Sequence, residues 1–315
     1  MRLFLFIVAA AALLLAALAV VTVIGTGMIE RAHPPQGRFV AVDGGRLHIL
    51  ELGDPASPAV VLLHGASGNL GDMRLSLGER LTARYRVILI DRPGHGWSER
   101  PGGEGDASPA RQAAIVHQAL GKMGVTRAII LGHSWAGAMA SAYALAYPSE
   151  VAGLVLLAPV THPWPGGVSF LNHLVTAPVI GLLVAHTLVM PAGYFLVPPG
   201  VRSVFSPLTP PAEYVERTGV RMILRPREFI ANAQDLVPLK AFVTAQAPRY
   251  GEIKGPVAII ASENDTIVIT DIHARAIAAQ APRSDLLVLP SAGHMVNYGA
   301  ADAVIRAIDK IAGAR

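Results

Sequence analysis

The stretch "RAIILGHSWAGAMASAYA", residues 127–144, decides the fold of this chain. Its first part is an apolar run of buried-strand length that ends at Gly132, and its second part is a helix-forming run of small residues. Ser134 stands at the junction, between His133 and Trp135. Open parallel sheets place their active groups at the carboxyl ends of strands, so a sharp turn here exposes the serine oxygen at that edge. The stretch predicts a strand–turn–helix carrying a nucleophilic serine.

The residues around this serine are small enough for a tight turn. A nucleophile elbow normally follows the pattern G-x-S-x-G. Here the fifth position is Ala136, and Gly137 follows directly. Alanine is the smallest departure available, so the tight backbone is still expected. An ordinary helix cap at Ser134 is the alternative interpretation.

Apolar runs of buried-strand length recur along the chain and alternate with helical patterns. Strands that are apolar on both faces and alternate with helices predict a mostly parallel, doubly wound α/β sheet covered on both sides. A hairpin is expected around the turn formed by Asp43, Gly44 and Gly45. The buried strands are predicted at residues 59–65, 86–91, 127–132, 151–159, 255–262 and 284–290.

The alternation of strands and helices breaks between Pro159 and Gly255. An apolar helical pattern over residues 169–197 is interrupted by Pro178 and Pro191, and two further helices are expected at residues 210–224 and 226–246. The sheet then resumes. This organisation predicts an α/β core formed by residues 38–159 and 251–315, with residues 160–250 inserted as a helical lid.

The N-terminal segment can cross a membrane. Residues 3–24 form an uncharged stretch that is long enough to span a bilayer core of about 30 Å as a helix. A cleaved signal peptide has a shorter apolar core, and its candidate cleavage site at residues 17–19 lies inside the run. We therefore expect an uncleaved transmembrane signal anchor at residues 1–27 and a linker at residues 28–37. Arg2 and the α-amine favour a cytoplasmic N-terminus, with the catalytic domain on the periplasmic or extracellular side.

Composition excludes several other classes of function. The chain has no cysteine, which excludes thiol catalysis and cysteine-ligated zinc, and its eleven histidines form no HExxH pair. The net charge of +4 comes from dispersed arginines, without the basic cluster of a nucleic-acid site. We therefore expect no metal, no cofactor and no nucleic-acid partner. The oligomeric state stays open.

Two further polar residues stand where a serine nucleophile needs them. Asp265 follows the strand at residues 255–262, and His294 follows the last strand. With Ser134 they have the chain order Ser–Asp–His of the α/β-hydrolase arrangement. We expect His294 to act as the base and Asp265 to orient it, with Glu263 as the alternative acid. The backbone N–H groups of Ala66 and Trp135 are the expected oxyanion-hole donors.

The sequence resembles the α/β-hydrolase superfamily. The segments "HGASGN", "DRPGHGWSERP", "LGHSWAG", "ENDTIV" and "AGHMVNY" match that family's landmarks in order, over roughly residues 38–312. "GHSWAG" is similar to the "GHDWGG" of epoxide hydrolases and dehalogenases, but Ser134 replaces their nucleophilic aspartate. The resemblance therefore implies acyl chemistry of the esterase kind.

Together these features predict a membrane-anchored serine hydrolase that cleaves carboxylic esters of hydrophobic substrates through an acyl-enzyme. With the same triad, carbon–carbon bond hydrolysis, perhydrolysis and acyl transfer are enzymatic alternatives. A non-catalytic binding protein on the same fold is the alternative of a different class. The expected partners are a hydrophobic ester and a membrane. The membrane is contacted through the N-terminal helix and, in one reading, through the apolar lid segment at residues 168–190, while a lid buried on its own domain is the other reading.

Overall fold

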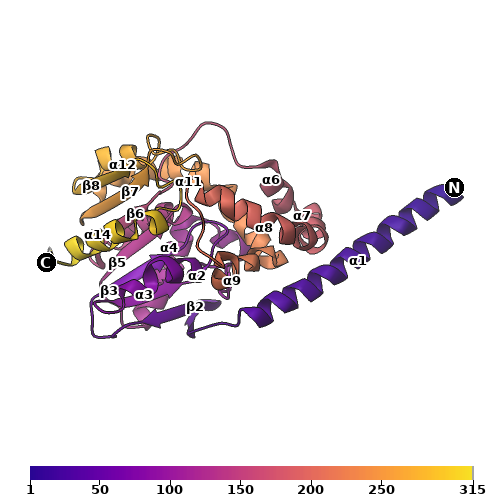
Figure 1. The fold of residues 1–315 in the computed structure, drawn as a ribbon, viewed down its shortest axis with the longest axis horizontal. Coiled ribbons are helices and arrows are strands. Elements are labelled where there is room, and N and C mark those ends of the chain that lie inside the picture. Colours follow the sequence, from indigo (N-terminus) through magenta and orange to yellow (C-terminus); the bar gives the residue numbers. More distant parts are fainter. Residues whose placement is uncertain (314–315) are drawn as a thin grey trace.

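One sheet of eight strands runs through the main body of the protein in the order β1-β2-β4-β3-β5-β6-β7-β8 (Figure 1). The computed structural model describes residues 1–313, so the last two residues of the predicted core range lie outside the described part. β1 and β2 pair as an antiparallel hairpin, β2 pairs antiparallel with β4, and the remaining pairs are parallel. The strands are β1 (Arg38–Val42), β2 (Gly45–Leu52), β3 (Ala59–Leu63), β4 (Arg86–Ile90), β5 (Ala128–His133), β6 (Val151–Leu157), β7 (Val257–Ser262) and β8 (Ser284–Leu289). The predicted doubly wound α/β fold is confirmed.

Helices cover both faces of this sheet because its central strands are apolar on both sides. Every residue of β3, β5, β6 and β7 is buried. Alternate residues face opposite layers: Val61 and Leu63 belong to one hydrophobic core, and Val60 and Leu62 belong to the other. The first core contains α4 (Pro109–Lys122), α5 (Trp135–Ala146) and α12 (Ala274–Gln280). The second contains α2 (Leu70–Met73), the π-helix η1 (Arg74–Gly78), α3 (Glu79–Leu81), α13 (Val296–Gly299) and α14 (Ala301–Gly313).

The start of α4 follows from its sequence. The Ser108 side chain accepts a hydrogen bond from the Arg111 amide, and Pro109 occupies the first helical position, where it needs no amide partner. A short 3-10 turn, η2 (Gly103–Asp106), precedes it. Local capping chemistry therefore places this helix where the sequence predicts it.

A group of helices joins β6 to β7 and stands to one side of the sheet in Figure 1. They are α6 (Phe170–Thr176), α7 (Pro178–Thr187), α8 (Val189–Phe205), α9 (Tyr214–Thr218), η3 (Val220–Leu224), α10 (Pro226–Leu236), α11 (Leu239–Gln246) and η4 (Ala247–Glu252). We call α6, α7 and α8 the lid helices.

Three predicted boundaries inside this helical group are wrong. The second break falls at Leu188 rather than at Pro191, because Pro191 lies in the first turn of α8, where a missing amide costs nothing. The helix expected over residues 210–224 is divided at Gly219, whose φ of +65° ends α9 before the 3-10 turn. The helix expected over residues 226–246 is divided at Pro238, between α10 and α11.

The N-terminal helix α1 (Arg2–Ala32) extends away from the sheet and past the lid helices (Figure 1). Within residues 1–313, α1 is the one single helix that is long and apolar enough to cross a membrane, and no residue in its most apolar stretch is fully buried. α6 and α7 are long and apolar enough to cross a membrane only when they are counted together as one segment, and this segment has a bend of 107° between the two helices. α1 continues through the first five residues of the range expected as a linker.

Candidate active site

The turn at Ser134 has the backbone of a nucleophile elbow. β5 ends at His133 and α5 begins at Trp135, so one residue makes the whole turn. Ser134 has φ +54° and ψ −118°, a conformation that residues with a Cβ rarely adopt. Its amide donates to the Leu157 carbonyl at 2.9 Å and its carbonyl accepts from the Val160 amide at 3.0 Å, which ties the strained turn to the end of β6.

Two glycines make this turn possible. A Cβ on Gly132 would overlap the carbonyl of Ala136, and a Cβ on Gly137 would overlap the side chain of Pro159. The close approach of α5 to β5 and to the end of β6 therefore requires glycine at both positions. Ala136, the departure from the usual pattern, is fully buried and fits without displacing the turn.

The structure brings Asp265 and His294 together. His294 Nδ1 lies 2.8 Å from Asp265 Oδ2, and both side chains are buried. Asp265 Oδ1 accepts the amides of Ile267 and Val268 at 2.8 and 2.9 Å. Burial by itself raises the pKa of Asp265, but the His294 hydrogen bond and the two amides outweigh it, so the net pKa lies below the usual value. The carboxylate is therefore held charged beside the imidazole.

The alternative acid, Glu263, does not reach the histidine. It is exposed and pairs with Arg275, which also bonds Asp271. His133, which precedes the serine, donates through Nε2 to the carbonyl of His294 at 3.1 Å. Burial, followed by the nearby His294, lowers the pKa of His133 to about 3, so this ring is neutral.

The loop after β3 lies against the elbow. An added Cβ on Gly65 would sit 3.0 Å from the Ser134 Cβ. The buried guanidinium of Arg92 holds this loop, since its Nε donates to the His64 carbonyl at 2.9 Å and its Nη2 donates to the Gly65 carbonyl at 3.2 Å. The Arg92 amide donates to His64 Nε2 at 3.0 Å, which leaves Nδ1 as the protonated nitrogen that bonds Gly65. Ala66, the next residue, lines the same cavity as the serine.

Trp135 points its side chain away from that cavity. Its indole donates to the Asp235 carbonyl at 3.1 Å and lies 4.0 Å beneath the Arg92 guanidinium. Arg92 also pairs with the Asp235 carboxylate at 2.8 Å, and His95 contacts the same oxygen at 2.8 Å. This fully buried cluster joins α10 to the elbow and to the loop after β4. Asp235 is not among the residues predicted from the sequence, since no local pattern marks it.

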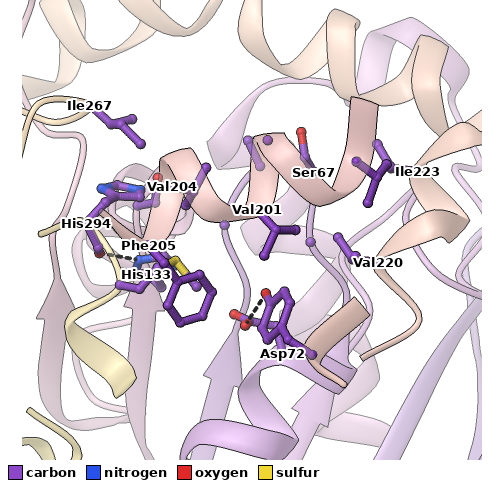
Figure 2. Close-up of a pocket in the computed structure, with 18 residues that line it drawn as sticks. Ser67, Asp72, His133, Val201, Val204, Phe205, Val220, Ile223, Ile267 and His294 are labelled. Carbon is purple, nitrogen blue, oxygen red and sulfur yellow. Dashed lines mark hydrogen bonds between the residues drawn. The ribbon is translucent and has the colours of Figure 1, made fainter. Parts of the chain in front are cut away.

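A cavity of about 380 Å³ has Ser134 in its lining, and Figure 2 shows side chains that line it. Ser134 and His294 both line it, and α8 contributes an apolar wall of Val197, Val201 and Val204. Its other lining residues are Gly65, Ala66, Ser67, Gly68, Asp72, His133, Gly200, Phe205, Tyr214, Val220, Ile223, Ile267 and Met295. Among these eighteen residues there is no lysine or arginine.

Asp72 is the cavity residue that sequence reasoning missed. Its Oδ1 accepts the hydroxyls of Tyr214 at 2.8 Å and Tyr298 at 3.0 Å (Figure 2 shows the carboxylate in the cavity wall). Burial raises the pKa of Asp72, although these hydroxyls and the Asn297 amide partly oppose the rise. The only sequence signal was Asn69, a helix cap three residues earlier.

Within residues 1–313 no group of three or more histidine, cysteine, aspartate or glutamate side chains is placed to hold a metal ion.

Comparisons with known proteins agree with this architecture. A family model described as the alpha/beta hydrolase fold matches residues 58–175. The 2-hydroxy-6-oxononadienedioate/2-hydroxy-6-oxononatrienedioate hydrolase of Klebsiella pneumoniae is 30% identical over 284 residues, which cover 84% of this chain and 91% of the relative.

Solved structures show the same fold at lower identity. The enol-lactonase of Burkholderia xenovorans LB400 is similar with a TM-score of 0.66 and 21% identity, over 88% of this chain and 100% of that one. A bacterial membrane phospholipase A is similar with a TM-score of 0.67 and 21% identity, over 98% of this chain and 97% of that one. The first similarity leaves about a tenth of this chain uncovered, whereas the second covers nearly all of it.

Proposed function

The chain belongs to the α/β-hydrolase fold family, and we propose that within this family it is a serine hydrolase that cleaves carboxylic esters of apolar substrates. The observation that carries the proposal is the shared cavity: a strained serine and a histidine paired with a buried carboxylate line one largely apolar space. A serine hydroxyl becomes an effective nucleophile when an adjacent base, oriented by a third group, removes its proton.

The proposed reaction has two steps. Ser134 Oγ attacks the ester carbonyl while His294 takes its proton, and His294 then gives that proton to the leaving alcohol. Asp265 orients the imidazole and stabilises its charged form. A water molecule, activated by His294, then cleaves the acyl-enzyme and releases the acid. The amides of Ala66 and Trp135 stabilise the oxyanion in both steps.

The lining of the cavity supports a neutral ester over an anionic substrate. The Klebsiella relative is named for dienedioates and trienedioates, which carry two carboxylates. A buried carboxylate needs a paired charge, and the eighteen lining residues here include no arginine or lysine. The one acidic residue among them, Asp72, repels an anion instead. Carbon–carbon bond hydrolysis remains the second candidate, because the same relative is 30% identical.

One experiment separates these functions. A fluorophosphonate probe is expected to label the purified full-length protein and not its Ser134→Ala variant, and p-nitrophenyl esters of increasing chain length are expected to be hydrolysed. A 2-hydroxy-6-oxo dienoate is the comparison substrate. Faster turnover of the dienoate than of every ester would favour carbon–carbon bond hydrolysis, and absence of labelling would favour a non-catalytic binding protein.

We further propose that α1 is an uncleaved anchor, with the catalytic domain outside the cytoplasm. The length and apolar character of α1 support the anchor, and the positive charge of Arg2 ahead of it supports the orientation. Carbonate washing of membranes is expected to leave the protein in the pellet, and mass spectrometry is expected to find the N-terminus intact. A new N-terminus near Ala19 would identify a cleaved signal peptide instead.

A further inference from the structure

The anchor helix and the lid are in contact along a continuous strip. α1 contacts α7, α8 and η3. A Cβ added to Gly25 would lie 2.9 Å from Met190 Cγ, so this glycine lets α1 approach α8 closely. Glu30 pairs with Arg225 at 3.1 Å, and the Trp97 indole donates to the His33 carbonyl at 3.0 Å. The end of α1 is therefore fixed to the body of the protein rather than joined to it by a loose linker.

The covered face of α1 extends well into its apolar part. The residues that are buried or half-buried recur every three or four positions, which places them on one face of the helix. They are Leu15, Leu18, Ala19, Thr22, Gly25, Thr26, Ile29 and Glu30, with Gly27 beside them. On the opposite side of the helix, Leu13 and Val20 are exposed. The helices that α1 contacts thus lie beside it from about Leu15 onward.

The contact with α1 determines how deep in a bilayer the lid helices lie. About 20 residues of helix cross a bilayer core, so a span that starts at Leu3 ends near Thr22. The helix rises about 1.5 Å per residue, so the covered face between Leu15 and Thr22 occupies about the last 10 Å of that span. Helices packed against this part of α1 lie at the same depth.

The outer surface of the lid helices suits such a depth. No aspartate, glutamate, lysine or arginine occurs between Thr161 and Val201. Val179 is 80% exposed and Phe195 is 76% exposed. Other exposed apolar lid residues are Phe170, Leu171, Ile180, Leu182, Leu183, Leu188 and Leu196. Tyr194 lies under the Arg221 guanidinium at 4.7 Å, an aromatic–cation pair of the kind found at the headgroup level.

We propose that the outer face of α6, α7 and α8 lies in the lipid bilayer beside α1, so that the catalytic cavity receives its ester from the membrane. The proposal rests on the proposed function for the substrate and on α1 as an anchor for the depth. α8 links the two surfaces, since Val197 and Val201 line the cavity while Phe195 and Leu196 on the same helix are exposed. The substrate class is accordingly a lipid-borne ester with a long acyl chain.

Because the chain contains no cysteine, a single introduced cysteine directs a thiol-reactive label to one chosen position. Single-cysteine variants of the full chain, Phe195→Cys and Val179→Cys, are labelled with an environment-sensitive fluorophore and reconstituted in vesicles of phosphatidylcholine and phosphatidylglycerol. Leu14→Cys, at an exposed position of α1, is the membrane control, and Arg306→Cys, on α14 at the opposite end of the molecule in Figure 1, is the water control. Nitroxide-labelled lipids and aqueous iodide are the two quenchers.

Labels at positions 195 and 179 are expected to behave like the label at position 14, quenched by lipid and protected from iodide. Quenching by iodide alone, as at position 306, would place the lid in water and overturn the proposal. Protection from both quenchers would mean that protein, such as a second copy of the chain, covers this face, and it would overturn the proposal too. Quenching of the label at position 14 by iodide would show instead that the assignment of α1 as an anchor is wrong.

A second measurement tests delivery of the substrate. The double variant Val179→Ser/Phe195→Ser is compared with Phe39→Ser/Leu287→Ser, which removes exposed apolar residues of the sheet edges. Turnover of a long-chain ester held in vesicles is expected to fall about fivefold or more in the lid variant only, while a short soluble ester is hydrolysed normally by both. Equal turnover of the vesicle-held ester by the two variants would overturn the proposal. If the wild-type protein hydrolyses neither ester, the proposed function fails, and the labels still decide where the lid lies.

Discussion

Tyr214 donates its hydroxyl to Asp72 at 2.8 Å, and this bond ties α9 of the helical group to α2 of the core in the wall of the cavity that Ser134 lines. The Asp72 carboxyl joins these two helices and also lines the cavity. It places an acidic group in a space lined otherwise mainly by apolar side chains and glycine. Asp72 is therefore a candidate determinant of which substrates the cavity accepts.

Substitution of Asp72 by asparagine is expected to admit anionic substrates. In the wild-type protein a second carboxylate in this space meets a like charge with little solvent screening. In Asp72→Asn, kcat/KM for an ester with a terminal carboxylate is expected to rise about tenfold at pH 8, which corresponds to about 1.4 kcal/mol. A neutral ester of the same length is expected to change little.

The exposed carboxylate of Asp285 provides the control, since Asp285→Asn removes the same charge outside the cavity. The pH dependence is a further check. Burial raises the pKa of Asp72, so its charge, and with it the selection against anions, is lost as the pH falls through that raised value. If Asp72→Asn still discriminated against the anionic ester as strongly as the wild-type protein, Asp72 would not be a determinant of substrate specificity.

Substitution of Ser134 by glycine is expected to stabilise the protein while abolishing esterase activity. A non-glycine residue at φ +54° and ψ −118° costs about 1–3 kcal/mol, and glycine relieves most of that strain. After the greater entropy of glycine in the unfolded chain is subtracted, a gain of about 1 kcal/mol raises Tm by about 2–4 °C. Ser134→Ala removes the hydroxyl but keeps the strain, so it is the matched control. A Tm for Ser134→Gly at or below that of Ser134→Ala would contradict the strained elbow.

Removal of the proposed acid is expected to impair chemistry rather than folding. Asp265→Asn keeps an oxygen for the amides of Ile267 and Val268, but it no longer holds the imidazole in its reactive form. We expect kcat to fall about 10⁴-fold, with a near-normal Tm. Because the three residues act as a unit, adding Ser134→Ala to Asp265→Asn is expected to lower kcat little beyond Ser134→Ala alone.

Glu263→Gln serves as the comparison for this series, since Glu263 is the other acidic residue after β7 and pairs with Arg275 at the surface. It is expected to keep full activity. The assignment of the acid would be reversed if Glu263→Gln lost as much kcat as Asp265→Asn.

Buried neutral histidines are expected to make the protein unstable in acid. Burial, followed by the neighbouring His162, lowers the pKa of His273 to about 4, and its Nδ1 accepts the amides of Thr161 and His162 at 3.2 Å. In the unfolded chain a histidine takes up its proton near pH 6.5. The stability that His273 contributes is therefore present above about pH 6.5 and is lost as the pH falls from there toward 4, by on the order of 1–3 kcal/mol.

His273→Asn keeps an acceptor near the two amides and removes the titrating group. Its Tm is expected to fall less steeply between pH 7 and pH 4 than that of the wild-type protein. His173→Gln, on the exposed side of α6, is expected to follow the wild-type curve. Parallel curves for His273→Asn and the wild-type protein would show that His273 does not contribute to the acid sensitivity.

Local patterns in the sequence were enough to predict the sheet, and they single out the polar residues that follow its strands. Apolar runs on both faces require a parallel sheet with two helical layers, and Gly132 and Gly137 permit the elbow at Ser134. Asp265 and His294 could be named because the carboxyl ends of parallel strands meet at one edge of the sheet. The structure shows that Asp265 contacts His294 whereas Glu263 pairs with Arg275, a difference in side-chain direction that the sequence does not encode for two acids two residues apart.

Other features depend on contacts that no local pattern encodes. Asp72 and Tyr214 are 142 positions apart, and Arg92 and Asp235 are 143 apart, so only the folded chain brings them together. The strip between α1 and the lid is of the same kind. The spacing of apolar residues tells how one helix divides its faces, whereas the identity of the surface opposite each face is set by packing across the whole molecule. For that reason the sequence determined which polar residues stand at the strand ends, and the tertiary structure decided how the cavity is lined and where the lid helices lie relative to α1.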